Sequence, residues 1–364
     1  MMHGISSSEQ PETLGGTASI YSRYRGYIKR KIFFLAAAGL LLAALVVFSS
    51  SAGTIRIPFK EVVSNLLRLD TTGVGRIIWD VRMPRIIAAL LVGAGLSLSG
   101  TVMQSVLRNP LASPYTLGLS SAAAFGASFA IVFFGAGTGT TSTIIISNSF
   151  AVALSAFIFS FLSTFAILLL TIITKISAES MILAGIAIGS IFSAGLTLMQ
   201  YLADSIQLAS IISWTFGDLG RANWQFLLIT ASVLIPVCVL FFYYRWDFNA
   251  LDTGEEAAKG VGVKTGAVRI AGMFASSIMS AVIVSFFGTI AFIGLLGPHI
   301  ARRILGGDHR FLLVASPIIG AIILLAADTA ARTILSPMVL PVGILTSLFG
   351  GPLFIYLLIT GRRK

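Results

Sequence analysis

Ten long apolar blocks, separated by short polar segments, constrain this chain more than any other feature of its sequence. They lie at residues 33–52, 84–107, 114–134, 146–173, 180–202, 223–244, 267–288, 290–305, 311–331 and 341–360. About 20 apolar residues form a helix that crosses a bilayer, and a backbone in hydrocarbon must satisfy its hydrogen bonds within its own segment. The sequence therefore predicts an all-α polytopic membrane protein with about ten transmembrane helices. The short block at 290–305 leaves nine as the alternative.

The composition favours the same class. Hydrophobic residues make up 56% of the chain and charged residues only 11%, with a mean hydropathy of +0.94. A soluble domain carries about a quarter charged residues, so this chain has too few to cover a soluble exterior. The formal net charge of +11 is expected to lie in cytoplasmic loops and gives no indication of nucleic-acid binding. A single cysteine, Cys238, excludes a disulfide framework or a cysteine metal site.

The charge distribution predicts the orientation of the chain. Polar residues 1–32 end in a basic cluster and are expected to form a flexible cytoplasmic tail. The apolar stretch that follows is longer than a signal-peptide core, so we expect it to be retained as the first helix. Residues 33–362 then form a single transmembrane domain. With the N-terminus inside, most Lys and Arg fall on the inner side, which predicts that both termini are cytoplasmic.

Two outer segments depart from this pattern. The segment 53–85 carries most of the outer positive charges and is expected to lie along the membrane interface, and 204–221 is expected to form a short surface helix. Arg82 and Arg85 end the first segment, and Arg332 lies at the outer end of the ninth helix. These arginines either snorkel to lipid headgroups or form a docking patch for an acidic partner.

The sequence contains no recognisable energy source for transport. The string Gly260 to Thr265 lacks the glycine that precedes the lysine of a Walker A loop, and Gly93-Ala-Gly95 lacks the third glycine of a dinucleotide fingerprint. Ionisable residues within the apolar blocks would mark an ion relay. Asp328 and His299 are near helix ends, with no evident partner at mid-membrane depth. Coupling to another polypeptide is therefore expected.

The inner loop 245–269 is the segment that would receive such coupling. It contains a helix-forming stretch after Gly254, which two later glycines end. This pattern predicts a short surface helix that fits a socket on a cytoplasmic ATPase. The residues assigned to this contact are Gly254, Glu255, Glu256, Ala257, Ala258 and Gly262. Small residues at Gly185 and Gly189 predict close helix packing, with pore lining as the alternative.

Five strings of the sequence occur in the order and spacing of one protein family. They begin with Arg82-Met-Pro-Arg85 and continue at 108–114, 288–302, 308–310 and 340–352. Together they resemble the FecCD family of ABC importer permeases, which has the type II fold of the vitamin B12 and iron–siderophore systems. The resemblance covers residues 54 to 362 and leaves the N-terminal 30 residues outside.

The resemblance implies a set of partners. Two ten-helix subunits, identical or related, would form the pathway at their interface, lined largely by the fifth helix. Two cytoplasmic ATP-binding subunits would carry ATP and Mg, and an extracytoplasmic substrate-binding protein would deliver the cargo. The chain itself would bind no cofactor or metal and have no catalytic residue, and it would lie in the lipid of the bacterial cytoplasmic membrane.

The resemblance also implies roles for single residues. Arg82, Arg85 and Arg332 would pair with glutamates of the binding protein, and Glu255 to Gly262 would be the coupling helix. A cytoplasmic gate would be formed by residues on two segments, namely Asn109, Leu111, Ser177, Glu179 and Ser180. Glu179 departs from the small hydroxyl residues that are usual at the second gate.

A ferric siderophore is the expected cargo, with haem or cobalamin as alternatives. A lining with few charges suits a bulky chelate better than a bare ion, which needs fixed ligands. A secondary transporter would need an ionisable site at mid-membrane depth, a channel would need a repeated selectivity element, and an intramembrane enzyme would need paired polar residues within its helices. The sequence shows none of these three features.

Overall fold

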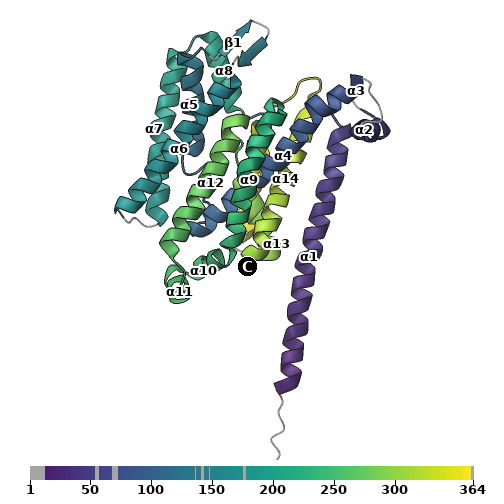
Figure 1. The fold of residues 1–364 in the computed structure, drawn as a ribbon, viewed down its shortest axis with the longest axis vertical. Coiled ribbons are helices and arrows are strands. Elements are labelled where there is room, and N and C mark those ends of the chain that lie inside the picture. The colour runs from purple at the N-terminus through teal and green to yellow at the C-terminus, as the bar shows by residue number, and fades with distance from the viewer. Residues whose placement is uncertain are drawn as a thin grey trace, which may run out of the picture.

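The computed structural model describes residues 13–53, 57–67, 73–135, 137–140, 143–146, 148–174 and 178–361. Each of the ten apolar blocks forms a helix (Figure 1). These helices are α1 (Thr13–Ser51), α4 (Met83–Val106), α5 (Leu119–Phe133), α6 (Ser149–Thr174), α7 (Ala178–Leu202), α9 (Trp224–Tyr243), α12 (Thr265–Phe287), α13 (Ile293–Leu305), α14 (His309–Thr333) and α15 (Val342–Gly361).

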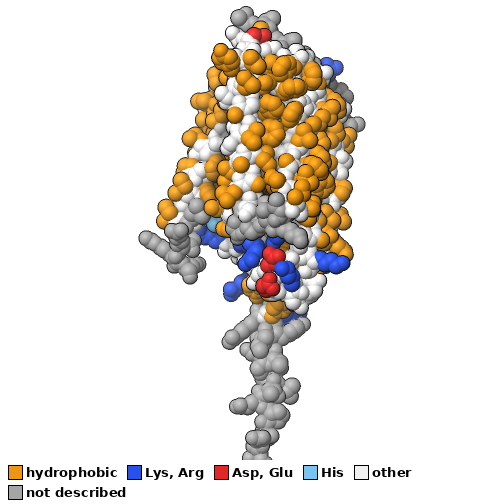
Figure 2. Space-filling view, turned by 90° about the vertical axis from the view of Figure 1, so that its left-hand side faces the viewer, with side chains coloured by type: hydrophobic (Ala, Val, Ile, Leu, Met, Phe, Trp, Pro, Cys, Tyr) orange, Lys and Arg blue, Asp and Glu red, His pale blue; other side chains and the backbone are white. Residues whose placement is uncertain are grey.

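The lengths of these helices confirm a multi-pass membrane protein. Within the described residues, 7 helices are long and apolar enough to cross a membrane, and α5 and the stretch Val342–Leu357 of α15 are apolar but shorter. Helix α13 has only 13 residues. Figure 2 shows apolar side chains covering one face of the helical body, while Lys, Arg, Asp and Glu gather at its lower end. An apolar belt with charges at an end is the surface expected of a chain in a bilayer.

Short elements connect the long helices. They are α2 (Phe59–Leu66), α3 (Gly73–Arg76), the π-helix η1 (Ile77–Arg82), α8 (Ser205–Thr215), the 3-10 helix η2 (Leu219–Arg221), α10 (Arg245–Thr253) and α11 (Glu255–Gly260). Besides the helices, the described residues include one antiparallel hairpin of two short strands, β1 (Gly137–Thr140) and β2 (Thr143–Ile146). The hairpin and α11 lie at opposite ends of the body, which we call the hairpin end and the α11 end (Figure 1).

Two helices begin earlier than the apolar pattern predicted. Helix α1 starts at Thr13, so residue 32 marks a change from polar to apolar sequence within one helix. The second membrane helix runs without a break from Gly73 to Val106. Its π-helical turn ends with the amide of Met83 donating to the carbonyl of Ile78, and Pro84, which has no amide proton, follows at the point where α-helix resumes. The segment predicted to lie along the interface is thus partly membrane helix.

Helix α4 forms the centre of the body and packs against α14, α12, α13 and α9. Small residues allow these backbones to approach closely. A Cβ on Gly93 would collide with the carbonyl of Gly320 on α14, and a Cβ on Gly100 would collide with Gly294 on α13. Ser97 adds hydrogen bonds, because its hydroxyl lies 2.7 Å from both the carbonyl and the hydroxyl oxygen of Ser316. Close packing and interhelical hydrogen bonds are what hold helices together in lipid.

The packing predicted for Gly185 and Gly189 on α7 is confirmed. A Cβ on Gly185 would lie 2.9 Å from the Cα of Leu117, and one on Gly189 would lie 2.9 Å from the Cα of Gly118. Gly118 has a φ of 75° and is the N-cap of α5, so the two glycines of α7 pack against the turn that precedes α5. The short surface helix predicted between 204 and 221 is also confirmed as α8, where Asp204 forms a capping box.

Candidate functional site

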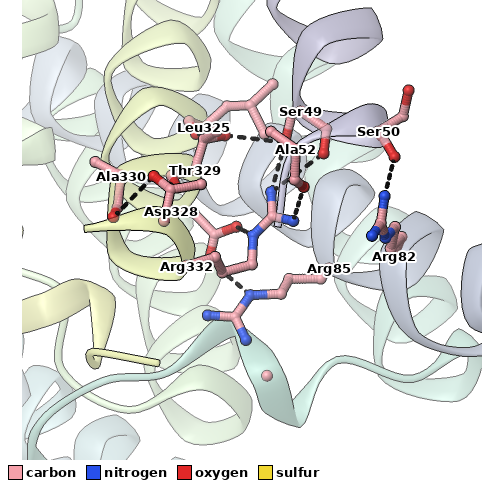
Figure 3. Close-up of polar contacts among 12 residues, drawn as sticks. Ser49, Ser50, Ala52, Arg82, Arg85, Leu325, Asp328, Thr329, Ala330 and Arg332 are labelled. Atoms are coloured by element: carbon pink, nitrogen blue, oxygen red, sulfur yellow. Dashed lines mark hydrogen bonds and ion pairs between the residues drawn. The ribbon is translucent and has the colours of Figure 1, made fainter. Parts of the chain in front are cut away.

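At the hairpin end, a buried carboxylate holds two arginines (Figure 3). Asp328 on α14 has no exposed surface, and it accepts from Nε of Arg85 at 2.7 Å and from Nε of Arg332 at 3.0 Å. A buried charge is tolerated only when it is paired and hydrogen-bonded. Arg85 also lies 3.3 Å from Asp218, which precedes η2. These ion pairs join α4 to α14 at their hairpin ends.

The arginines also fasten α1. Arg332 donates to the hydroxyl of Ser49 at 2.6 Å and to the carbonyl of Ala52 at 3.0 Å, and Arg82 donates to the carbonyl of Ser50. The last carbonyls of a helix have no partner within the helix, so guanidinium groups satisfy the end of α1. We call Ser49, Arg82, Arg85, Asp328 and Arg332 the Asp328 cluster.

The three arginines predicted to dock a binding protein therefore lie together, but largely inside the protein. The side chains of Arg85 and Arg332 are 11% and 8% exposed, and the residue Arg82 is 6% exposed. Snorkelling to headgroups does not describe guanidinium groups that are bonded inward. The docking role stays a prediction, and a carboxylate from a partner would have to compete with Asp328 for Arg85 and Arg332.

The sequence interpretation placed Asp328 near the outer end of its helix, with no evident partner at mid-membrane depth. The structure gives this carboxylate two partners, and both lie at the hairpin end. The i,i+4 spacing to Arg332 is a local signal that could have identified one of them. The other partner, Arg85, is 243 positions away in the chain, and no local pattern reveals such a contact.

At the α11 end, the predicted short helix is confirmed as α11. Gly254, with a φ of 131°, precedes it, and Gly262, with a φ of 87°, turns the chain after it. On the inner side of the helix, Ala258 is fully buried, and Glu255 accepts from Arg269 at 2.9 Å. Its other side is open to solvent, where the Glu256 side chain is 93% exposed. Helix α11 is thus anchored on one side and free on the other.

The electrostatics of α11 keep its anchor charged. The hydrogen bond from Arg269 is the largest cause that holds the pKa of Glu255 below its ordinary value, and Lys259 acts in the same direction. Lys259 lies 3.2 Å from Glu255 at the i,i+4 spacing. The ion pair with Arg269 is therefore present throughout the neutral pH range.

Helix α10, which precedes α11, is tied to the helical body through Asp252. Its carboxylate accepts from Arg302 at 3.1 Å and lies 3.2 Å from Nε2 of His309, while the same Nε2 lies 2.7 Å from the hydroxyl of Ser105. His309 has no exposed surface. A protonated Nε2 can donate to both oxygens. We call Ser105, Asp252, Arg302 and His309 the His309 cluster, and it joins α10 to α4, α13 and α14.

Burial and bonding oppose each other at Asp252. Burial raises the pKa of its carboxyl, but the hydrogen bond and charge of His309, with the charge of Arg302, outweigh burial and leave the pKa below the ordinary value. A second contact supports the same junction, because Asn249 on α10 accepts from the backbone amide of His309 at 2.8 Å. The sequence interpretation placed His309 in a family string and gave it no role.

The predicted gate residues Asn109 and Leu111 follow the last turn of α4. The amide of Asn109 donates to the carbonyl of Gln104 at 3.0 Å, and its side-chain oxygen accepts from the amide of Leu111 at 2.8 Å. Leu111 is 44% exposed. Ser177 lies outside the described residues, as does the side chain of Glu179, and Ser180 lies in the first turn of α7. The gate role of all five residues stays a prediction.

A cavity of about 570 Å³ opens between the turn at Tyr115, the turns that follow α8 and α12, and the start of α15. Gly217 and Gly288 have φ values of 66° and 75°, and the amide of Gly343 donates to the carbonyl of Gly217 at 3.2 Å. Irregular backbone at membrane depth is tolerated where it is buried in protein or lines a cavity. The lining combines hydroxyl, aromatic and aliphatic side chains, namely Tyr115, Thr215, Phe216, Thr289, Ala291, Ile344, Ser347 and Leu348.

A comparison of this sequence with known protein families identifies the family to which the chain belongs. Residues 41–360 match the family described as the FecCD transport family. The chain belongs to this family. The match spans the ten helices from within α1 to within α15, and the family name confirms the resemblance drawn from the five strings.

Curated relatives match over nearly their whole length. A protein of Methanocaldococcus jannaschii that is assigned as an ABC transporter permease is 46% identical to this chain. The match covers 93% of this chain and 98% of that protein. The hemin transport system permease protein of Yersinia pestis is 35% identical over 89% and 95%. The Fe(3+)-citrate import system permease protein of Bacillus subtilis is 38% identical over 92% and 97%.

A solved structure shares the fold. It is described as an inward-facing conformation of a protein assigned as a metal-chelate type ABC transporter, and it is 33% identical with a TM-score of 0.78. The match covers 90% of this chain and 99% of that one. The fold predicted from the resemblance is confirmed.

Proposed function

We propose that this chain is the membrane-spanning permease subunit of an ABC importer. The observation that carries the proposal is α11, a helix anchored by Glu255 and Ala258 on one side and open to solvent on the other, at the charged end of an apolar body. Such a helix fits a socket on a separate ATPase, and membership in the FecCD family supports this assignment. The α11 end then faces the cytoplasm together with both termini.

The ATPase partner supplies the energy in this proposal. Two cytoplasmic ATP-binding subunits carry ATP and Mg, and this chain contributes no nucleotide site. Closure of the ATPase dimer pushes on α11, and the movement alternately opens the two ends of a pathway. Val261, which directly follows α11 and is 74% exposed, is the apolar contact that the socket would cover.

A second permease subunit completes the pathway, and an extracytoplasmic binding protein loads it at the hairpin end. On α7, the face away from the Gly185 contact carries large apolar side chains that are more than half exposed, including Leu183, Ile191 and Tyr201. The cavity lined by Tyr115 and Ser347 opens to the outside of this single chain, and a second copy would close it into a channel. Because these apolar side chains are exposed in the single chain, we expect lipid and a second subunit to cover them in the membrane.

An iron chelate is the proposed cargo, with a ferric siderophore first and haem or cobalamin as alternatives. Permeases for hemin and Fe(3+)-citrate among the relatives support this class. The cavity lining offers hydroxyl groups, aromatic rings and aliphatic carbon without a charged side chain. Such a lining contacts a ligand cage weakly and gives a bare cation no fixed ligands, so a wrapped iron fits better than a free ion.

The test is ATP-driven uptake in a strain that lacks its own iron-chelate permeases. The chain is expressed with its cognate ATPase and binding protein, and radiolabelled ferric siderophores, ferric citrate, haem and cobalamin are supplied in turn. Uptake of a ferric chelate that stops when the ATPase is inactivated supports the proposal. Uptake of haem or cobalamin alone would change the cargo but not the mechanism. Transport of an iron chelate without the ATPase would refute the coupling to ATP.

A further inference from the structure

Two side-chain bridges converge on the last turn of α4. The first runs from Asp252 on α10 through His309 to Ser105, with the distances of 3.2 Å and 2.7 Å given above. The second runs from Glu255 on α11 through Arg269, which pairs with Glu255 at 2.9 Å and also donates Nε to the carbonyl of Val106 at 3.1 Å. The two bridges therefore end on neighbouring residues of one helical turn.

That turn holds the predicted gate. The amide of Arg108 donates to the carbonyl of Ser105, and the amide of Asn109 donates to the carbonyl of Gln104, each at 3.0 Å. Arg108 has a φ of 49°, a left-handed conformation that an L-residue keeps only where its surroundings hold it. These two hydrogen bonds tie Ser105 to Arg108 and Gln104 to Asn109, so we expect a displacement of Ser105 or Val106 to reach Asn109 through the same turn.

Both bridging residues are shielded from solvent. His309 is completely buried, and the Arg269 side chain is 12% exposed. Within the described residues, Nδ1 of His309 has no hydrogen-bond partner, so the ring makes its hydrogen bonds only through Nε2, toward Asp252 and Ser105. Hydrogen bonds in a medium of low polarity are stronger than in water, which suits them to transmit a displacement between helices.

We propose that His309 and Arg269 are positioning residues that carry the movement of the α10–α11 segment to the gate turn of α4. This proposal rests on the proposed function and deepens it, because it assigns the path from the ATPase contact to the pathway. Coupling between two sites requires an element that both sites bias. The last turn of α4 is such an element, since it is bonded to the coupling segment on one side and bears Asn109 on the other.

The test uses the complete transporter, with permease, ATPase and binding protein reconstituted in proteoliposomes. ATP hydrolysis and cargo uptake are measured in the same vesicles, and their ratio is the readout. His309→Ala and Arg269→Ala each remove one bridge. We expect hydrolysis to continue while the cargo moved per ATP falls by roughly tenfold, within the roughly 5- to 150-fold range of coupling between sites. The double variant should lower the ratio further.

Two further variants separate transmission from stability. His309→Gln restores a side-chain amide donor near the position of Nε2 and should recover much of the ratio. Ser316→Ala is the matched control, because it removes the buried hydroxyl contacts of Ser316 on α14 with Ser97 and Thr101 on α4, which do not involve α10. An unchanged ratio in both bridge variants overturns the proposal. So does a parallel loss of hydrolysis, uptake and thermal stability that the control shares. Absence of ATP-driven uptake in the wild-type complex would instead overturn the proposed function.

Discussion

The two ends of α4 and α14 are joined by polar clusters of different kinds. At the hairpin end, the Asp328 cluster is buried and joins the ends of membrane helices to one another and to Asp218 before η2, with the carboxylate held by two guanidinium groups. At the α11 end, the Asp252 side chain is 23% exposed and links the same two helices to α10, outside the helical body. One cluster closes the body on itself, and the other connects it to a protruding segment. The same helix pair is thus fixed at one end and accessible to a partner at the other.

The largest effect is expected at the fixed end. Asp328→Ala leaves two buried guanidinium groups without their carboxylate, and breaking a buried pair costs about 3–5 kcal/mol. Unfolding of the purified chain in detergent micelles, followed by denaturant titration, measures this loss. Asp204→Ala removes the N-cap of the exposed helix α8 and should cost only about 1 kcal/mol. Equal losses in the two variants would contradict the structural role of the Asp328 cluster.

The second effect concerns Asp252 at the accessible end. Asp252→Ala removes a partly exposed carboxylate from Arg302 and His309, so a smaller loss of about 1–3 kcal/mol is expected. We expect cargo uptake per ATP hydrolysed to fall as well, because α10 loses its contact with His309. A stability loss as large as that of Asp328→Ala, with normal coupling, would show that the two clusters serve the same purpose.

The third effect tests the turn after α11. Gly262 has a φ of 87°, so Gly262→Val forces a β-branched residue into a conformation that costs an L-residue about 1–2 kcal/mol. We expect the altered turn to displace α11 and to lower uptake per ATP hydrolysed. Gly260→Ala is the control, since a Cβ there meets no atom within 4 Å. If both variants transport normally, α11 does not transmit the movement of the ATPase.

The smallest effect is the pH dependence of the accessible end. The folded-state pKa of Asp252 lies below its ordinary value of 3.8, and a depressed carboxyl pKa adds stability that is complete above the unfolded value and is lost as the pH falls through the folded one. The difference in unfolding free energy between wild type and Asp252→Asn should therefore shrink as the pH falls below about 4. A difference that does not shrink in this acid range would contradict the assignment.

Local sequence signals predicted most of the helices and the form of α11. Apolar blocks of sufficient length identify membrane helices, and glycines beside Glu and Ala identify a short helix with defined ends. The start of the second membrane helix at Gly73 was missed because Arg76, Asp80 and Arg82 interrupt its apolar pattern. Those charges are tolerated near a helix end, where Arg82 bonds inward to the carbonyl of Ser50.

The polar clusters could not be predicted, because their members are distant in the chain. Ser105 and His309 are 204 positions apart, and Arg85 and Asp328 are 243 apart. Each residue alone has an ordinary sequence context, and only the packing of α4 on α14 brings the pairs together. The resemblance to a family identified the arginines as one group, but it did not indicate that a carboxylate already holds two of them.

Hydrogen exchange of the complete transporter tests the contrast between the two ends most directly. Amide protection is compared with and without a non-hydrolysable ATP analogue, for peptides that cover 83–93 and 325–333 at the hairpin end and 103–111 and 250–263 at the α11 end. The account predicts that nucleotide changes protection at the α11 end, including the gate turn, and leaves the hairpin end as it was. A change confined to the hairpin end, or one of equal size at both ends, would contradict it.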